Sequence, residues 1–149
     1  MSTGYGIGGR LRGLAAVALL VSGLSGCALV GDDRQQSTAV ENREVQASEV
    51  AGVWEGEGGA RLTLTEWDER FVAVDLEADR PERYGLPVNA KGRVSGEGTW
   101  SFGKYVPGYQ VDLHFEGPGG LTLTVAELDD KLVLSGYIND GDEFLLYRK

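Results

Sequence analysis

The chain is 149 residues long and carries 23 acidic against 14 basic residues, for a formal net charge of -9 at pH 7. A surface of this sign repels nucleic acid and anionic lipid headgroups, so we expect neither nucleic-acid binding nor a basic membrane-binding patch. Cys27 is the only cysteine, which excludes an internal disulfide and leaves folding to the apolar core.

The first 26 residues have the features of an export signal. Arg10 and Arg12 form a short basic region, and an apolar run from Leu14 to Val21 follows it. Ser22 and Gly23 interrupt this run before it reaches the length of a transmembrane helix. We therefore expect residues 1–26 to be a signal peptide.

This segment ends in the motif Leu24-Ser25-Gly26-Cys27, which resembles the lipobox of bacterial prolipoproteins at every position. The resemblance implies cleavage before Cys27 and a diacylglyceryl lipid on its sulfur, which labelling with palmitate would detect. It also implies a lipid-anchored location on the extracytoplasmic face of the cell membrane. We therefore expect Cys27 to be the lipidation site and the membrane to be one partner.

Residues 27–48 are polar after the first few positions and show no periodic pattern. A segment without aromatic residues cannot bury enough apolar surface to order itself, so we expect the lipidated Cys27 to be followed by a flexible tether. Residues 49–149 then form one small domain. Ser48 precedes Glu49-Val50-Ala51 and is expected to cap a single helical turn before the first strand.

The domain alternates between apolar and polar residues with a period of two, which predicts an all-β fold. Turn residues such as Gly58-Gly59, Asp129-Asp130 and Asp140-Gly141 separate the segments. Eight antiparallel strands joined in sequence favour a small up-and-down barrel, with a β-sandwich as the alternative. The strands are expected near residues 52–57, 61–65, 71–76, 94–102, 111–116, 121–125, 132–138 and 143–148.

The alternation also predicts which side chains point into the barrel. Gly96 and Gly98 lie on the inward face of their strand, where they would allow the sharp bend that closure needs. The other expected inward residues are bulky, so we expect them to fill the interior. They are Trp54, Leu62, Leu64, Val72, Val74, Leu76, Trp100, Phe102, Leu113, Phe115, Leu121, Leu123 and Leu134.

Gly52-Val53-Trp54 in the first strand and Arg148 in the last resemble the calycin superfamily, which includes the lipocalins. That resemblance implies a structural pair in which Arg148 lies across Trp54, a cation–π contact. The domain is also similar to small uncharacterised lipoproteins of actinobacteria, a resemblance that brings no known activity. Glu69 departs from their pattern, which usually has glycine in the first hairpin.

The sequence contains no recognisable catalytic or metal-binding constellation. His114 is the only histidine, and the expected solvated strand face around it also carries Asp112 and Glu116. Asn139 to Glu143 resembles part of a calcium loop but lies between two strands, where a hairpin turn is expected. We therefore expect no enzyme activity, no cofactor and no metal.

Two surface segments are candidates for contacts with a partner. The connection from Ala78 to Lys91 is the longest between predicted strands and contains Tyr84, and the loop from Lys104 onward carries Tyr105 and Tyr109. Long loops and exposed tyrosines suit protein contacts, although the same segments could simply cover the end of the barrel.

These patterns favour a monomeric, membrane-anchored lipoprotein of the cell envelope whose barrel is a non-catalytic interaction module. The partner would be a protein or the cell wall. The alternative is a calycin-like carrier of a small apolar ligand. A filled interior favours the interaction module, because an eight-stranded barrel has room only for its own side chains or one small ligand.

Overall fold

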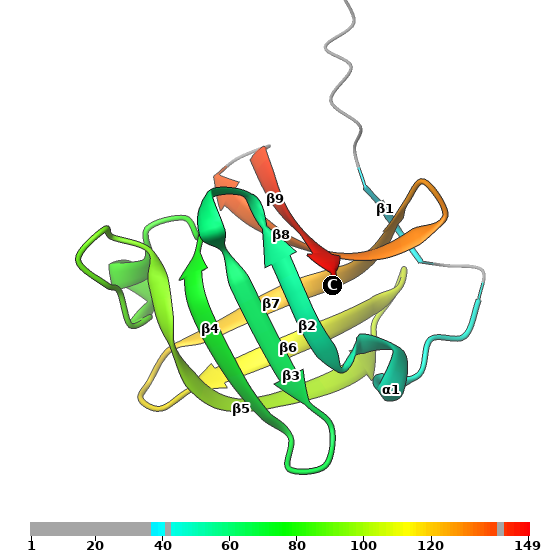
Figure 1. The fold of residues 1–149 in the computed structure, drawn as a ribbon, viewed down its shortest axis with the longest axis horizontal. Helices are drawn as coiled ribbons and strands as arrows, with labels where there is room; N and C mark the ends of the chain where they lie inside the picture. The colour runs from blue at the N-terminus through cyan, green and yellow to red at the C-terminus, as the bar shows by residue number, and fades with distance from the viewer. Residues whose placement is uncertain (1–36, 41–42, 140–141) are drawn as a thin grey trace, which may run out of the picture. The chain divides into compact units, whose positions relative to one another are not determined.

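A computed structural model of the chain describes residues 37–40, 43–139 and 142–149 (Figure 1). Cys27 and the predicted signal peptide lie outside these residues. The described elements, in chain order, are β1 (Thr38–Ala39), α1 (Ala47–Val50), β2 (Gly52–Gly56), η1 (Glu57–Gly59), β3 (Arg61–Thr65), β4 (Arg70–Leu76), η2 (Pro81–Tyr84), β5 (Val94–Lys104), β6 (Tyr109–Phe115), β7 (Gly120–Leu128), β8 (Lys131–Asn139) and β9 (Asp142–Arg148).

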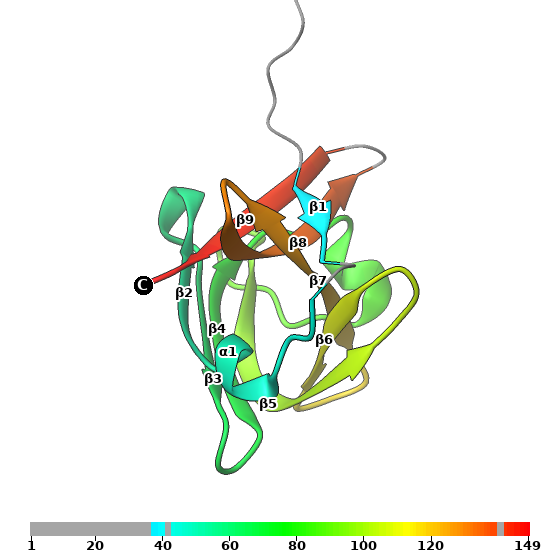
Figure 2. The ribbon, with the colours of Figure 1, turned by 90° about the vertical axis from the view of Figure 1, so that its right-hand side faces the viewer.

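Strands β2 to β9 form a closed antiparallel barrel. Each pairs with the next strand along the chain, and β9 pairs back onto β2 through Trp54 opposite Arg148. The prediction of an eight-stranded up-and-down barrel is confirmed, and closure excludes the sandwich alternative. One further strand, β1, pairs with the end of β7 where its pairing with β6 has stopped, so it extends the sheet beside the barrel (Figure 2).

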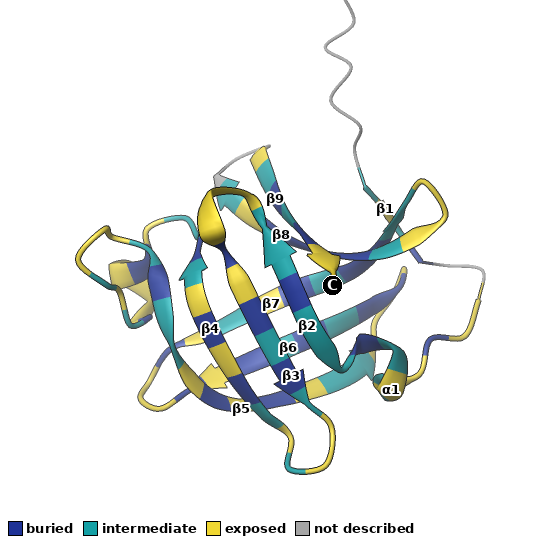
Figure 3. Cartoon of the chain, viewed as in Figure 1, coloured by how far each residue is buried: buried dark blue, intermediate teal, exposed yellow. Residues whose placement is uncertain are grey.

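Bulky apolar side chains occupy the inside of the barrel, and Figure 3 shows buried and exposed residues alternating along its strands. Phe102 and Leu121, two of the expected inward residues, are only partly buried. Nine others are confirmed as buried: Trp54, Leu62, Leu64, Leu76, Trp100, Leu113, Phe115, Leu123 and Leu134.

The predicted inward face of β4 is wrong. Val72 and Val74 are 49% and 43% exposed, whereas Phe71 and Ala73 are buried. The pairing of β4 with β5 shifts between Ala73 and Leu76, and Asp75 in this irregularity has a φ of 53°. A bulge of this kind turns the following residue to the other face, so Leu76 is buried although it lies three positions after Ala73.

Polar contacts with β5 and with the long connection after β4 stabilise this bulge. The backbone N–H of Asp75 donates to Ser95 Oγ at 2.9 Å, and Lys91 Nζ lies 2.8 Å from the Asp75 carboxylate. Asn89 Nδ2 donates to the same carboxylate. These contacts compensate for the broken strand pairing at a residue whose backbone is in the left-handed region.

Gly98 lies between two phenylalanines that meet inside the barrel. Its register partners are Phe71 on β4 and Phe115 on β6, whose rings pack edge to face with centroids 4.9 Å apart. A Cβ atom at Gly98 would lie 1.9 Å from the carbonyl oxygen of His114. Gly98, which was expected to face inward, therefore allows β5 and β6 to approach each other closely.

Part of the segment expected to be a tether packs against the barrel. Thr38 and Ala39 pair with Glu127 and Ala126 of β7. Val40 and Val45 are each only 3% exposed and belong to the main apolar core. The two valines are sparse in a polar sequence, so the composition of the segment did not reveal that they bury against the barrel.

The single helical turn expected around residue 48 is present as α1, but Gln46 rather than Ser48 is its N-cap. Glu49 accepts a hydrogen bond from the backbone N–H of Gln46 at 2.9 Å, which forms part of a capping box. Ser48 lies inside the turn and is exposed. Among the residues that the structure describes, no helix is long and apolar enough to span a bilayer.

A carboxylate on β9 binds the residue that precedes β1. Glu143 accepts hydrogen bonds from the backbone N–H and the hydroxyl of Ser37, at 3.0 and 2.9 Å, and from Ser135 Oγ at 2.6 Å. Burial by itself would raise the pKa of Glu143, but the bonds from Ser135 and Ser37 outweigh it and the net pKa is lowered. The ionised carboxylate therefore helps to hold Ser37 on the barrel.

Candidate functional site

An open groove of about 540 Å³ lies between the segment before α1 and the β5–β6 hairpin. The segment forms one wall and the hairpin forms the other. Val45 is buried, so it holds the first wall against the barrel. The side chains that the groove offers to a ligand belong to Arg43, Glu44, Gln46, Phe102, Lys104 and Tyr109.

Two stacked aromatic rings form the apolar part of the groove. Phe102 and Tyr109 lie with their centroids 5.4 Å apart and their planes 3° from parallel. Lys104 Nζ lies 5.7 Å from the Tyr109 centroid, within the range of a cation–π contact. Tyr109 is only 6% exposed, so it is not an exposed residue at the loop tip but part of the lining of the groove.

The opposite wall contains a charge cluster. Arg43 donates to Glu49 at 2.8 Å and to Glu127 at 3.0 Å, which joins the segment to both α1 and β7. The hydrogen bond from Arg43 lowers the pKa of Glu49, so this carboxylate stays ionised at neutral pH. Because Arg43 is matched by two carboxylates, Lys104 and Glu44 supply the charges of opposite sign that the groove offers to a ligand.

The loop between β5 and β6 lies directly beside the groove and exposes apolar surface. Tyr105 is 53% exposed and Val106 is 99% exposed. The backbone N–H of Tyr105 donates to the Gly108 carbonyl oxygen at 2.7 Å, which closes the loop. Tyr105, which was a candidate partner contact from the sequence, is therefore exposed beside the groove. Its neighbour Val106 was not among the candidates.

Tyr84 is also exposed, but the structure does not bring it to the groove. It ends η2 in the long connection, at the left end of the molecule in Figure 1, while α1 lies at the right end. Leu86 of this connection is 6% exposed and belongs to the core. The long connection thus covers one end of the barrel, and Tyr84 is an isolated surface residue.

The expected pair of Trp54 and Arg148 is in contact at the other end of the barrel. Arg148 Cζ lies 5.9 Å from the Trp54 ring centroid, and the guanidinium donates to the carbonyl oxygens of Glu49 and Ala51. Gly52 has a φ of 136°, and a Cβ there would lie 3.3 Å from Arg148 Nη2. The glycine of the Gly-x-Trp motif therefore makes room for the arginine, and the pair has a structural role.

The polar face around His114 lies on the outside of β6. His114 and Glu116 are exposed, Glu116 is bound by Arg70 at 2.8 Å, and Asp112 accepts from Thr122 at 2.6 Å. Within the described ranges, no group of three or more His, Cys, Asp or Glu residues is arranged to hold a metal ion. Residues 140–141, at the tip of the expected β8–β9 turn, lie outside those ranges.

Sequence reasoning missed the wall formed by residues 43–46, because it assigned them to the tether. Two signals could have indicated it: the valines at positions 40 and 45 in an otherwise polar stretch, and Glu49 three residues after Gln46. Phe102 was assigned to the interior, although it also lines the groove.

Comparison of this chain with protein-family models, with curated proteins and with solved structures finds no match in any of the three.

Proposed function

We propose that this protein is a lipid-anchored component of the cell envelope and that its barrel is a non-catalytic interaction module. The groove and the β5–β6 loop form the contact surface, and the occupant is a segment of a partner protein. The proposal rests on one observation: Tyr105 and Val106 are exposed beside a groove with an aromatic base. Exposed aromatic and apolar residues around a concavity are typical of protein contacts.

The chemistry of the groove suits a short peptide segment. Its volume of about 540 Å³ is in the range of pockets that hold small ligands or a few residues. The Phe102–Tyr109 stack offers an apolar surface to one side chain of the peptide. Lys104 and Glu44 offer one charge of each sign, which matches a peptide better than a purely anionic or purely apolar molecule.

The character of the interior supports an interaction module rather than a carrier. Trp54, Leu113 and Leu123 have no exposed surface, and each points into the same apolar core. Interiors filled in this way are close-packed and leave few spaces larger than a water molecule. An apolar ligand would have to displace these side chains in order to bind inside the barrel.

The anchor is proposed from the Leu24-Ser25-Gly26-Cys27 motif. Replacement Cys27→Ala should abolish labelling with palmitate and leave an unprocessed precursor, as judged by mass on a denaturing gel. Persistent labelling of the variant would contradict the anchor but would leave the groove proposal untouched, because the groove belongs to the barrel.

The contact surface is tested by recovery of the partner from native membranes after chemical crosslinking. The double variant Tyr105→Ala/Val106→Ala should lower recovery at least tenfold. The matched control is Tyr147→Ala, which removes an exposed tyrosine from β9. Equal recovery with both variants would contradict the groove as contact surface, and stoichiometric micromolar binding of a fatty acid by the unmodified protein would favour the carrier instead.

A further inference from the structure

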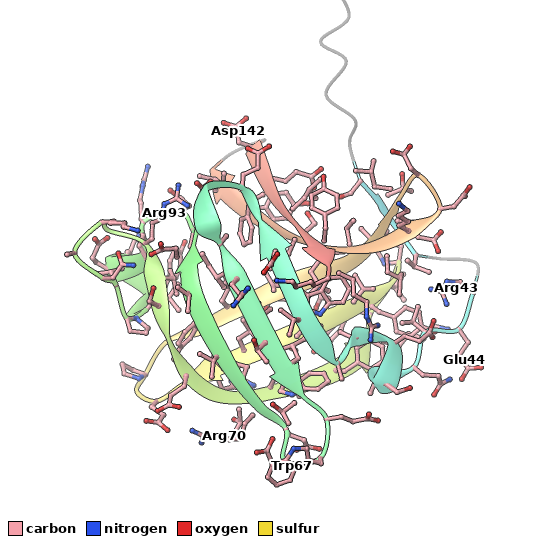
Figure 4. All side chains as sticks on the ribbon, in the orientation of Figure 1. Arg43, Glu44, Trp67, Arg70, Arg93 and Asp142 are labelled. Carbon is pink, nitrogen blue, oxygen red and sulfur yellow. The ribbon has the colours of Figure 1, made fainter. Side chains whose placement is uncertain are left out.

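Trp67 is the exposed member of the three tryptophans in this chain. It is 85% exposed, whereas Trp54 and Trp100 are 0% and 4% exposed. It lies in the turn between β3 and β4, and Figure 4 shows it at the lower edge of the molecule. An indole held in water loses the apolar burial that makes tryptophan favourable in folded proteins, so its position calls for another explanation.

The turn itself does not need the Trp67 side chain. Asp68 Oδ1 accepts the backbone N–H of Arg70 at 3.1 Å, and the Glu69 carbonyl oxygen accepts the backbone N–H of Trp100 at 2.8 Å. The Trp100 indole donates to the Thr65 carbonyl oxygen at 2.9 Å. These bonds order the backbone on both sides of Trp67. The turn would therefore lose little conformational entropy when a partner binds.

The same hairpin carries further exposed apolar residues. Because Phe71 and Ala73 face inward, Val72 and Val74 lie on the outer face of β4, where they are 49% and 43% exposed. We call Trp67, Val72 and Val74 the hairpin surface. Its members come from one supersecondary unit and lie apart from the groove, which is formed by the segment before α1 and the β5–β6 hairpin.

The charge around the hairpin surface is negative. Glu66, Asp68 and Glu69 flank Trp67 in the chain, and all three lie in the turn. Arg70 binds Glu116 at 2.8 Å and lies 3.8 Å from Glu97. Arg61, the register partner of Val74, donates to Glu55 at 3.1 Å. Neighbouring carboxylates therefore already balance both basic residues. Anionic lipid headgroups would be repelled by such a surface, whereas a basic protein surface would be attracted.

The hairpin also lies far from the point where the chain enters the barrel. In Figures 1 and 2, which differ by a rotation about the vertical axis, β1 lies in the upper half of the barrel and the β3–β4 hairpin is at the bottom.

From these observations we infer that the hairpin surface is a second docking site, separate from the groove. Its partner is a protein with an apolar pocket for the Trp67 indole, bordered by lysine or arginine side chains. The indole and the two valines supply apolar contact, while the three acidic residues of the turn select a basic partner and exclude an acidic one.

The test uses the full chain in intact cells. A photo-crosslinking phenylalanine derivative is placed at position 67 and, as a matched control, at position 137, because Tyr137 is also an exposed aromatic residue at 66%. A discrete protein adduct is expected from position 67 and not from position 137. Introducing Glu66→Lys and Glu69→Lys together should lower the yield of that adduct at least tenfold, and raising the salt concentration in isolated membranes should also lower it.

Every outcome decides the inference. A protein adduct that is specific to position 67 and lost on charge reversal supports it. No adduct, an adduct to lipid, or a protein adduct that is insensitive to charge reversal and salt overturns it. The variant Tyr105→Ala/Val106→Ala should leave the position-67 adduct unchanged, so failure of the groove proposal and failure of this inference give different results. Thermal unfolding of the charge-reversed chain checks that the barrel is intact.

Discussion

Strands β4 and β6 are both seven residues long and both line the same barrel, but they differ in what their outer faces carry. The outward positions of β6 include Asp112 and His114, while those of β4 include Val72 and Val74. In β6 only the apolar residues can face the core, because burying Asp112 or His114 would cost their hydration. In β4 both sets are apolar, so hydrophobicity alone allows either face to be inside.

Neighbouring strands resolve the ambiguity in β4. Phe71 fits because Gly98 opposite it has no side chain, and its ring then meets Phe115 of β6 at 4.9 Å. Had Val72 pointed inward, the ring of Phe71 would lie in water and Glu97, the register partner of Val72, would be directed to the core. The comparison shows that when both faces of a strand are apolar, its buried face can be identified only from its cross-strand partners.

The strongest test of this comparison is Phe71→Ala in β4. Phe71 is 1% exposed, so its loss leaves a large space beside Phe115. We expect the free energy of unfolding to fall by about 3 to 5 kcal/mol, measured by urea denaturation of residues 37–149. A loss below about 1 kcal/mol would mean that the ring is not packed in the core.

The corresponding change in β6 is Leu113→Ala. Leu113 has no exposed surface and lies opposite Trp100 and Leu121. We expect a loss of about 2 to 5 kcal/mol in the same denaturation experiment. A mild effect, together with micromolar binding of a fatty acid, would indicate an existing cavity at this position and would support a carrier.

The bulge is tested by Asp75→Val. A β-branched side chain is strained at a φ of 53°, and the change also removes the acceptor for Lys91 and Asn89. We expect a loss of about 1 to 3 kcal/mol from the backbone strain. The control Asp75→Asn tolerates the left-handed region and should be closer to the unmodified protein.

We also expect the Asp75 carboxylate to make the stability of the fold depend on pH. The hydrogen bond from Lys91 lowers the pKa of Asp75, and Asn89 adds to this effect. A lowered pKa in the folded state means that the ionised form stabilises the fold above the ordinary aspartate pKa. This contribution should be lost as the pH falls from about 4 through the lowered pKa of the folded state. Asp75→Asn should flatten that part of a plot of stability against pH, and an unchanged acid slope would show that the contact with Lys91 has no influence.

The smallest effect is expected from Val72→Ala. Since Val72 is half exposed on the outer face of β4, its truncation should change stability by no more than about 0.5 kcal/mol. The measurement is the melting temperature of Val72→Ala, compared with that of Phe71→Ala. A loss as large as that of Phe71→Ala would mean that the outer face of β4 is covered by another part of the protein.

The candidate groove shows the limit of composition as a guide to structure. The loop with Tyr105 was recognisable from its own sequence, because two tyrosines flank a Val-Pro-Gly turn. The other wall was not, because Arg43, Glu44 and Gln46 are polar and the wall is ordered by distant residues. Val45 buries against the barrel, and Arg43 binds Glu127, which is 84 positions away in the chain.

The sequence by itself determined the fold class, the number of barrel strands and most of the interior. Period-two alternation and glycine or aspartate turns are local signals, and each strand pairs with its sequence neighbour. Only the tertiary structure decided the buried face of β4 and the docking of residues 37–40 and 43–48. Both depend on partners far along the chain, since the energy of a side chain that can be accommodated in two ways depends on what lies opposite it.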